Sequence, residues 1–166
     1  MRVLFAYGYC GLGGVETSIL NRCEALRRRG IETIVFFREF YGTGGVAFAD
    51  RPQVRVGLPQ IPSLLAERFD VICVIDYPDF VSLARAQAPD AALLLETHSA
   101  HTTRLVGFHQ LAGSPSIRAV IVPSSFNRAQ VLRVGEPAGP IHLVPNGIDT
   151  ARFQPQPVQA LRGSQT

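Results

Sequence analysis

The chain has 166 residues, enough for one domain that buries a core without disulfides or structural metal ions. Its apolar share of 46%, charged share of 17%, 15 glycines and 12 prolines exclude a disordered tail and a collagen-like fibre. The net charge is +3, and all 16 basic residues are arginines. They are scattered along the chain apart from one run at 27–29, so no nucleic-acid partner is predicted.

No transmembrane segment and no disulfide framework are predicted. The longest stretches without Asp, Glu, Lys or Arg are 13 residues, at 3–15 and 105–117, which is too short to span a bilayer. Three cysteines with no C-x-x-C pair favour reduced thiols and a cytoplasmic location. No basic amphipathic helix with a broad apolar face is visible, and membrane association stays open.

Short apolar runs of β type alternate with helical patterns along the chain. The best-marked helix is 15–29, since its apolar residues share one face and Gly30 can end it in the left-handed conformation. Further helices are expected at 62–69, from Pro78, at about 102–111 and at 125–134. About seven strands are expected, at 3–7, 32–37, 54–57, 71–75, 92–95, 119–122 and 141–144, with a long loop at 41–53.

This alternation predicts a doubly wound α/β domain, a Rossmann-like parallel sheet with helices on both faces. Ligands in such sheets bind beyond the carboxyl ends of the strands, where the strand order reverses. Candidate site residues should therefore directly follow strands. Four segments do so, at 8–14, 96–99, 123–125 and 145–149.

The glycine loop at 8–14 follows the first strand and opens the best-marked helix. Its free N–H groups and the positive end of the helix suit an anionic group or a sugar; alternatively, the glycines only make a tight turn. The loop fails as a dinucleotide fingerprint, because counting from Gly11 puts Glu16 where the third glycine belongs. Glu16 either complements the helix dipole or hydrogen-bonds a ligand or a neighbouring loop.

Two motifs resemble family-4, group-1 glycosyltransferases of the GT-B architecture. Residues 13–16 read G-G-V-E, and residues 144–149 read V-P-N-G-I-D with Phe153 four positions later. Weaker similarities are His98 after L-E-T and the S-S-F run at 124–126. The resemblance covers residues 1–153 and implies the amino-terminal, acceptor-side half of such an enzyme.

The resemblance also implies what lies beyond this half. Residues 154–166, rich in Pro and Gln, are expected to be a tail or the start of an interdomain linker. The second domain of the family, which binds most of the donor and carries a two-glutamate motif, is expected to be missing here. The chain alone is then expected to be inactive.

The activity implied is transfer of a sugar from a nucleoside-diphosphate sugar to an acceptor hydroxyl, with retention of anomeric configuration. Gly13 and Gly14 are expected to donate backbone N–H groups to the departing diphosphate. His98 is the expected catalytic residue, hydrogen-bonding a sugar or acceptor hydroxyl, with a purely structural histidine as the alternative. Neither a metal nor a cofactor besides the donor is expected, because no third ligand accompanies His98 and His101.

Other candidates lie near the same edge. Arg104 and Arg128 follow strand ends and suit an anionic acceptor, although exposed helix-surface arginines are commoner. Asn146 and Asp149 are expected to order the turn after the last strand, and Asp76 fits either an acceptor contact or a helix start. The full predicted site is His98 as catalytic residue and Gly13, Gly14, Glu16, Ser124, Arg104, Arg128 and Asn146 as substrate-binding residues.

Two other functions remain open. An NAD(P)-binding Rossmann domain predicts micromolar affinity for NAD(H). A noncatalytic α/β binding domain, complete at 166 residues, predicts that the glycine loop lines no pocket. The sequence identifies neither the sugar, the nucleotide nor the acceptor.

Overall fold

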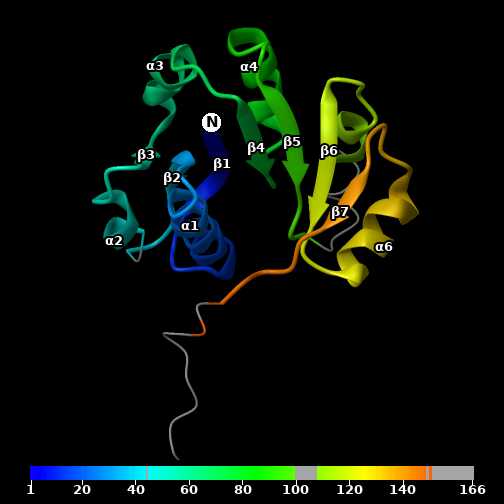
Figure 1. Ribbon diagram of the computed structural model, residues 1–166, viewed down its shortest axis with the longest axis horizontal. Helices are drawn as coiled ribbons and strands as arrows, with labels where there is room; N and C mark the ends of the chain where they lie inside the picture. Colours follow the sequence, from blue (N-terminus) through cyan, green and yellow to red (C-terminus); the bar gives the residue numbers. More distant parts are fainter. Residues whose placement is uncertain (44, 100–107, 149, 151–166) are drawn as a thin grey trace, which may run out of the picture.

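The computed structural model, which describes residues 1–43, 45–99, 108–148 and 150, is built on one sheet of seven parallel strands (Figure 1). The strand order is β3-β2-β1-β4-β5-β6-β7, so its direction reverses between β1 and β4. This is the Rossmann-like arrangement, and it confirms the predicted fold and strand number. The strands are β1 Arg2–Cys10, β2 Glu32–Phe40, β3 Val54–Val56, β4 Val71–Ile75, β5 Ala92–Glu96, β6 Ile117–Val122 and β7 Ile141–Leu143.

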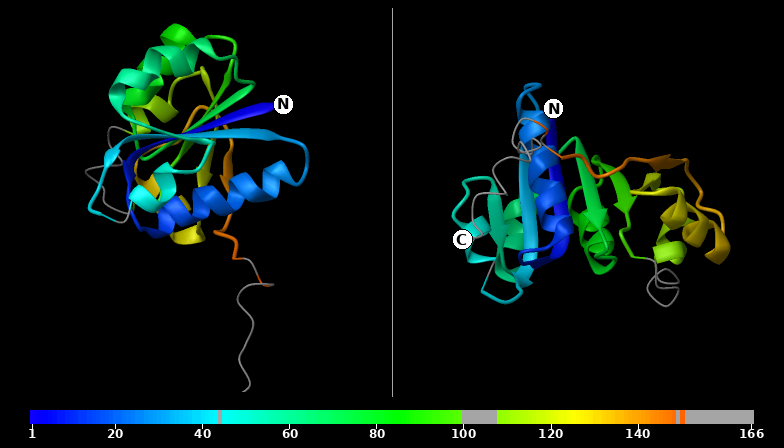
Figure 2. Two further views of the ribbon diagram at one scale, coloured as in Figure 1. Left: turned by 90° about the vertical axis from the view of Figure 1, so that its left-hand side faces the viewer. Right: turned by 90° about the horizontal axis from the view of Figure 1, so that it is seen from below.

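Helices cover both faces of the sheet (Figure 2). One buried cluster joins α1 and α2 to one face, and the other joins α3, α4, residues 108–112 and α6 to the opposite face. Within the described ranges, every helix is too short or too polar to cross a bilayer. The helices are α1 Gly14–Arg27, α2 Val46–Ala49, the 3-10 turn η1 Leu58–Gln60, α3 Ile61–Ala66, α4 Asp79–Gln87 and α6 Ser125–Val134.

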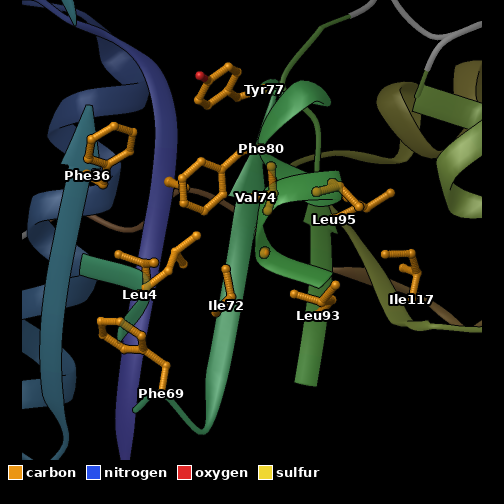
Figure 3. Packing of buried hydrophobic residues seen from close by; sticks show 14 of the residues in the cluster. Leu4, Phe36, Phe69, Ile72, Val74, Tyr77, Phe80, Leu93, Leu95 and Ile117 are labelled. Carbon is orange, nitrogen blue, oxygen red and sulfur yellow. The ribbon is translucent and has the colours of Figure 1, made fainter. Parts of the chain in front are cut away.

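The alternation of side chains along each strand builds these two core layers. In β1, Val3 and Phe5 belong to the cluster beneath α1, while Leu4 packs with the opposite cluster. In that second cluster the ring of Phe36 stacks on that of Phe80 with centroids 5.5 Å apart (Figure 3). Both side chains are fully buried, so this layer fixes α4 against the centre of the sheet.

Two details differ from the sequence prediction. Strand β1 runs to Cys10 rather than ending at residue 7, because Tyr9 and Cys10 pair with Glu39 and Phe40 of an equally extended β2. The glycine loop is therefore a short bend at 11–13. The predicted loop at 41–53 is wrong in part, since α2 lies within it and buries Phe48. The predicted helix at 102–111 falls mostly outside the described residues, and its described end, from residue 108, is helical.

Candidate functional site

The bend between β1 and α1 is braced from within by Glu16. This side chain is 6% exposed, and its Oε1 accepts a hydrogen bond from the N–H of Gly11 at 3.1 Å. Gly13 is the N-cap residue of α1, and a Cβ placed there would lie 2.3 Å from Glu16 Oε2. Glu16 therefore holds the neighbouring loop, one of the two roles the sequence left open, and a larger residue at position 13 would displace its carboxylate.

An open groove of about 630 Å³ lies against this bend at the amino end of α1. It combines glycine backbone with aromatic side chains, and Tyr9 and Tyr41 contact each other edge to face at a centroid distance of 5.7 Å. The noncatalytic alternative predicts that the glycine loop lines no pocket, and the structure differs from it on that point. Its lining is Tyr7, Tyr9, Gly11, Leu12, Gly13, Gly14, Val15, Glu16, Tyr41 and Gly42.

Replacing the two neighbouring glycines with alanine is expected to have opposite effects on stability. Gly13→Ala forces its Cβ against the Glu16 carboxylate and should cost about 1–3 kcal/mol. Gly14→Ala meets nothing within 4 Å and adds a better helix former, so it should stabilise by up to about 1 kcal/mol. Urea unfolding of both variants measures this. Equal effects of the two substitutions would show that Glu16 does not brace the bend.

A buried charged cluster lies where β5 ends. Glu96 is 2% exposed, and Arg22 of α1 donates to both its carboxylate oxygens, from Nη1 at 2.6 Å and from Nη2 at 2.7 Å. The Nε2 atom of His98 lies 2.6 Å from Glu96 Oε1. Arg22 also stacks over the ring of Phe5, with its Cζ 5.4 Å from the ring centroid. The sequence analysis placed Glu96 in a candidate segment, 96–99, but gave a role only to His98 and did not name Arg22.

Glu96 is ionised in this cluster. Its burial by itself would raise the pKa of the carboxyl, but hydrogen bonds from His98 and Arg22 outweigh that effect and lower the pKa to about 2. On the other side of the carboxylate, the thiol of Cys73 lies 3.5 Å from Glu96 Oε2. Burial raises the pKa of Cys73 well above its usual value, so this thiol stays protonated and can donate.

Asp76, directly after β4, fixes the backbone beside His98. One of its carboxylate oxygens accepts from Thr97 Oγ1 at 2.7 Å, and the other accepts from the N–H of His98 at 3.0 Å. Asp76 has a φ of 42°. Among the described residues it is the non-glycine residue with a positive φ. A strained residue at the strand edge often marks a functional position. Asp76 thus positions the main chain of His98. The sequence analysis had offered only an acceptor contact or a helix start for this residue.

The other predicted residues lie around this edge in different settings. Ser124 caps α6: its Oγ accepts from the N–H of Asn127 at 3.1 Å and donates to that residue's Oδ1 at 2.6 Å. Asn127 Nδ2 in turn donates to the carbonyl of Ser99 at 3.3 Å, so this cap is joined to the segment after His98. Arg128 is exposed on α6. Arg104 lies outside the described residues.

The side chain of Asn146 makes a contact beyond its own turn. Its Oδ1 accepts from Ser18 Oγ of α1 at 2.8 Å, because residues 144–148 run from β7 across the carboxyl edge of the sheet toward α1 (Figure 1). Beside this crossing, a cavity of about 310 Å³ separates α1 from the segment that contains Gly147 and Ile148. Asp149, the other predicted turn residue, lies outside the described residues.

The glycine bend and His98 belong to the same edge but not to one cavity. They follow β1 and β5, which flank β4, so about 10 Å separates the two strands. His98 does not line the groove, and its side chain is 10% exposed. Helix α1 joins the two places: its amino end borders the groove, and its Arg22 holds Glu96. In the described ranges, no three His, Cys, Asp or Glu side chains gather as metal ligands.

The structure defines a Rossmann-like α/β domain with an open groove at the amino end of its first crossover helix. The family model described as Glycosyltransferase Family 4 matches residues 12–152, and the chain belongs to that family. The match includes residues 13–16 and 144–149, from which this family was predicted, and it confirms the prediction. A search of curated proteins gives no significant match.

Proposed function

We propose that this domain takes part in the transfer of a sugar from a nucleoside-diphosphate sugar to an acceptor hydroxyl, with retention of configuration. The observation that supports this most is the open groove at the amino end of α1 in a chain of glycosyltransferase family 4. The amino end of the 14-residue helix α1, where the first N–H groups have no partner within the helix, borders that groove. Such a site suits the charge that develops on a departing diphosphate.

The groove also offers a place for the acceptor. Tyr9 and Tyr41 are 41% and 71% exposed, and tyrosine combines an apolar ring face with a hydroxyl. A sugar ring has the same two characters, with C–H faces and hydroxyl edges. We propose that the acceptor lies against these tyrosines, and that Gly13 and Gly14 face the diphosphate.

A second Rossmann-like domain is part of this proposal. It would bind most of the donor and close over the carboxyl edge of the sheet, so the domain described here would not turn over alone. A cytoplasmic location is proposed as well, because Cys10, Cys23 and Cys73 are all free and buried. No cofactor besides the donor is needed for this chemistry.

The test uses the glycosyltransferase that contains this domain together with its second domain, and measures nucleoside diphosphate released from UDP- and GDP-hexoses. Gly14→Asp places a carboxylate where the diphosphate is proposed to bind, and should lower turnover by about 100-fold. The fold should persist, because a Cβ at Gly14 meets nothing within 4 Å and Asp suits a first helical turn. Gly14→Asn, equal in size but uncharged, is the control and should lose much less.

Three results would count against the proposal. Gly14→Asp and Gly14→Asn could lower turnover equally, which would exclude an anion at this position. The product could carry the inverted anomeric configuration by proton NMR. The domain could instead be saturated by micromolar NADH, which would favour the dinucleotide-binding alternative.

A further inference from the structure

We propose that Arg22 and Glu96 are positioning residues for His98. They hold its Nε2 atom as the hydrogen-bond donor to Glu96, so that Nδ1 is left to accept a hydrogen bond from a ligand hydroxyl. The use of Nδ1 by a ligand rests on the proposed function, whereas the arrangement of the three side chains does not. The inference names both the atom of His98 that meets the substrate and the chemical group it recognises.

The inventory of donors and acceptors around Glu96 leads to this assignment. Oε1 faces Nη2 of Arg22 at 2.7 Å and Nε2 of His98 at 2.6 Å, while Oε2 faces Nη1 of Arg22 at 2.6 Å. An ionised carboxylate only accepts and a guanidinium only donates, so the contact with His98 requires a proton on Nε2. When the ring is neutral it carries only this one N–H, and Nδ1 then keeps a lone pair.

Burial leaves the ring few alternatives. The side chains of Glu96 and His98 are 3% and 10% exposed, and Asp76 fixes the backbone N–H of His98 at 3.0 Å. Among the described residues, the titratable or charged groups that contact this pair are Arg22 from α1, Cys73 from β4 and Asp76 after β4. No hydrogen bond to Nδ1 is made by any residue in the described part of the chain.

The chemistry of the ligand follows from the free lone pair. A nitrogen that only accepts can bind the O–H of a sugar or of an acceptor, but it repels the oxygens of a phosphate or carboxylate. His98 should therefore recognise a hydroxyl and leave the diphosphate to the glycine bend. Arg22 belongs to the same helix that borders the groove, so one element sets both positions.

The first experiment needs no substrate. Nitrogen-15 NMR of the full chain at pH 8, with His98→Gln to assign the ring, should place the proton on Nε2. Its N–H signal should be visible because burial and the hydrogen bond to Glu96 slow exchange with water. The signal should disappear in Glu96→Leu and persist in Arg27→Met, a control on the same helix whose partner, Glu24, is exposed. A proton on Nδ1, or an Nε2–H signal unchanged in Glu96→Leu, overturns the assignment.

The second experiment tests whether the arrangement serves the reaction, in the complete glycosyltransferase. Glu96→Gln and Arg22→Met should lower kcat by about 10–100-fold, as losses of supporting partners of a functional histidine do. Arg22→Lys, which keeps the charge, should recover part of that loss, and Arg27→Met should match the wild type. The KM for the donor should change less than twofold, because the diphosphate is bound elsewhere.

The outcomes separate this inference from the proposed function. If His98→Ala loses activity while folded Glu96→Gln and Arg22→Met retain it, the inference is wrong and the function stands. If His98→Ala keeps full activity, Nδ1 meets no ligand and the inference is wrong in its second half. If the complete protein transfers no sugar, the proposed function fails, and the wild-type NMR measurement still decides how His98 is held.

Discussion

Arg22→Met is expected to destabilise the domain by about 3–5 kcal/mol, the usual cost of breaking a buried ion pair by removing one partner. The substitution keeps most of the side-chain volume but leaves the ionised carboxylate of Glu96, 3% exposed, without its two strongest donors. His98 alone cannot replace a guanidinium that binds both oxygens. Urea unfolding at pH 7, monitored by circular dichroism, measures the loss.

A matched control lies five residues further along α1. Arg27 pairs with Glu24, but the side chains are 72% and 44% exposed, so Arg27→Met should change stability far less than Arg22→Met. In the double variant with Glu96→Leu and Arg22→Met, no unpaired charge remains buried, and much of the lost stability should return. Equal costs for Arg22→Met and Arg27→Met would mean that the buried pair is not what holds α1 to β5.

The fold could be predicted because each buried strand reads as a continuous apolar run and each crossover helix has an apolar face. The run at 71–75 is the clearest case: the strand occupies those residues in the structure and lies at the centre of the sheet. The expectation that Gly30 takes a left-handed conformation is also confirmed, with φ at 73°. These features depend on neighbouring residues, and local sequence contains that information.

The charged cluster could not be predicted in the same way. Arg22 and Glu96 are 74 positions apart, and they meet only because β4 and β5 follow β1 in the sheet with α1 lying across that face. In the sequence, Arg22 stands seven positions after Val15, beside Ile19 and Leu26 at the edge of the apolar face of the helix, but nothing there identifies Glu96 as its partner. The positive φ of Asp76 leaves no mark in the residue type, since Asp is equally common at helix starts. Tertiary contact, which the sequence does not display, creates both features.

The ends of β1 and β2 were missed for a related reason. Glycine at position 8 suggested a turn, but a Cβ there would meet nothing within 4 Å, and the strand continues past it. Pairing with the neighbouring strand extended both elements, and local propensity gave no sign of it. The bend therefore begins at Gly11 rather than at Gly8, and the strand itself contributes Tyr7 and Tyr9 to the groove.

Acid should weaken the domain through Glu96 by roughly 3 kcal/mol between pH 4.5 and pH 2. The carboxyl has a pKa of about 2 in the folded protein, against an ordinary value of 4.5. In that interval Glu96 is protonated in the unfolded chain but ionised in the folded protein. The free energy of unfolding therefore rises with pH. The contribution of Glu96 is fully present above pH 4.5 and is lost as the pH falls through 2.

Comparison with Glu96→Gln isolates this contribution from that of the other carboxyls. The variant should be less stable than the wild type at pH 7, and the difference should shrink steadily below pH 4.5, because protonation makes the wild-type side chain neutral as well.

Glu24→Gln is the control, since Glu24 is paired with Arg27 but exposed, and 1 M salt should remove its small effect. The gap between wild type and Glu96→Gln should survive the same salt, because the cluster is buried. A gap that stays constant from pH 7 to pH 2 would mean that Glu96 is not ionised in the folded protein, and the assignment of the proton on His98 would fall with it.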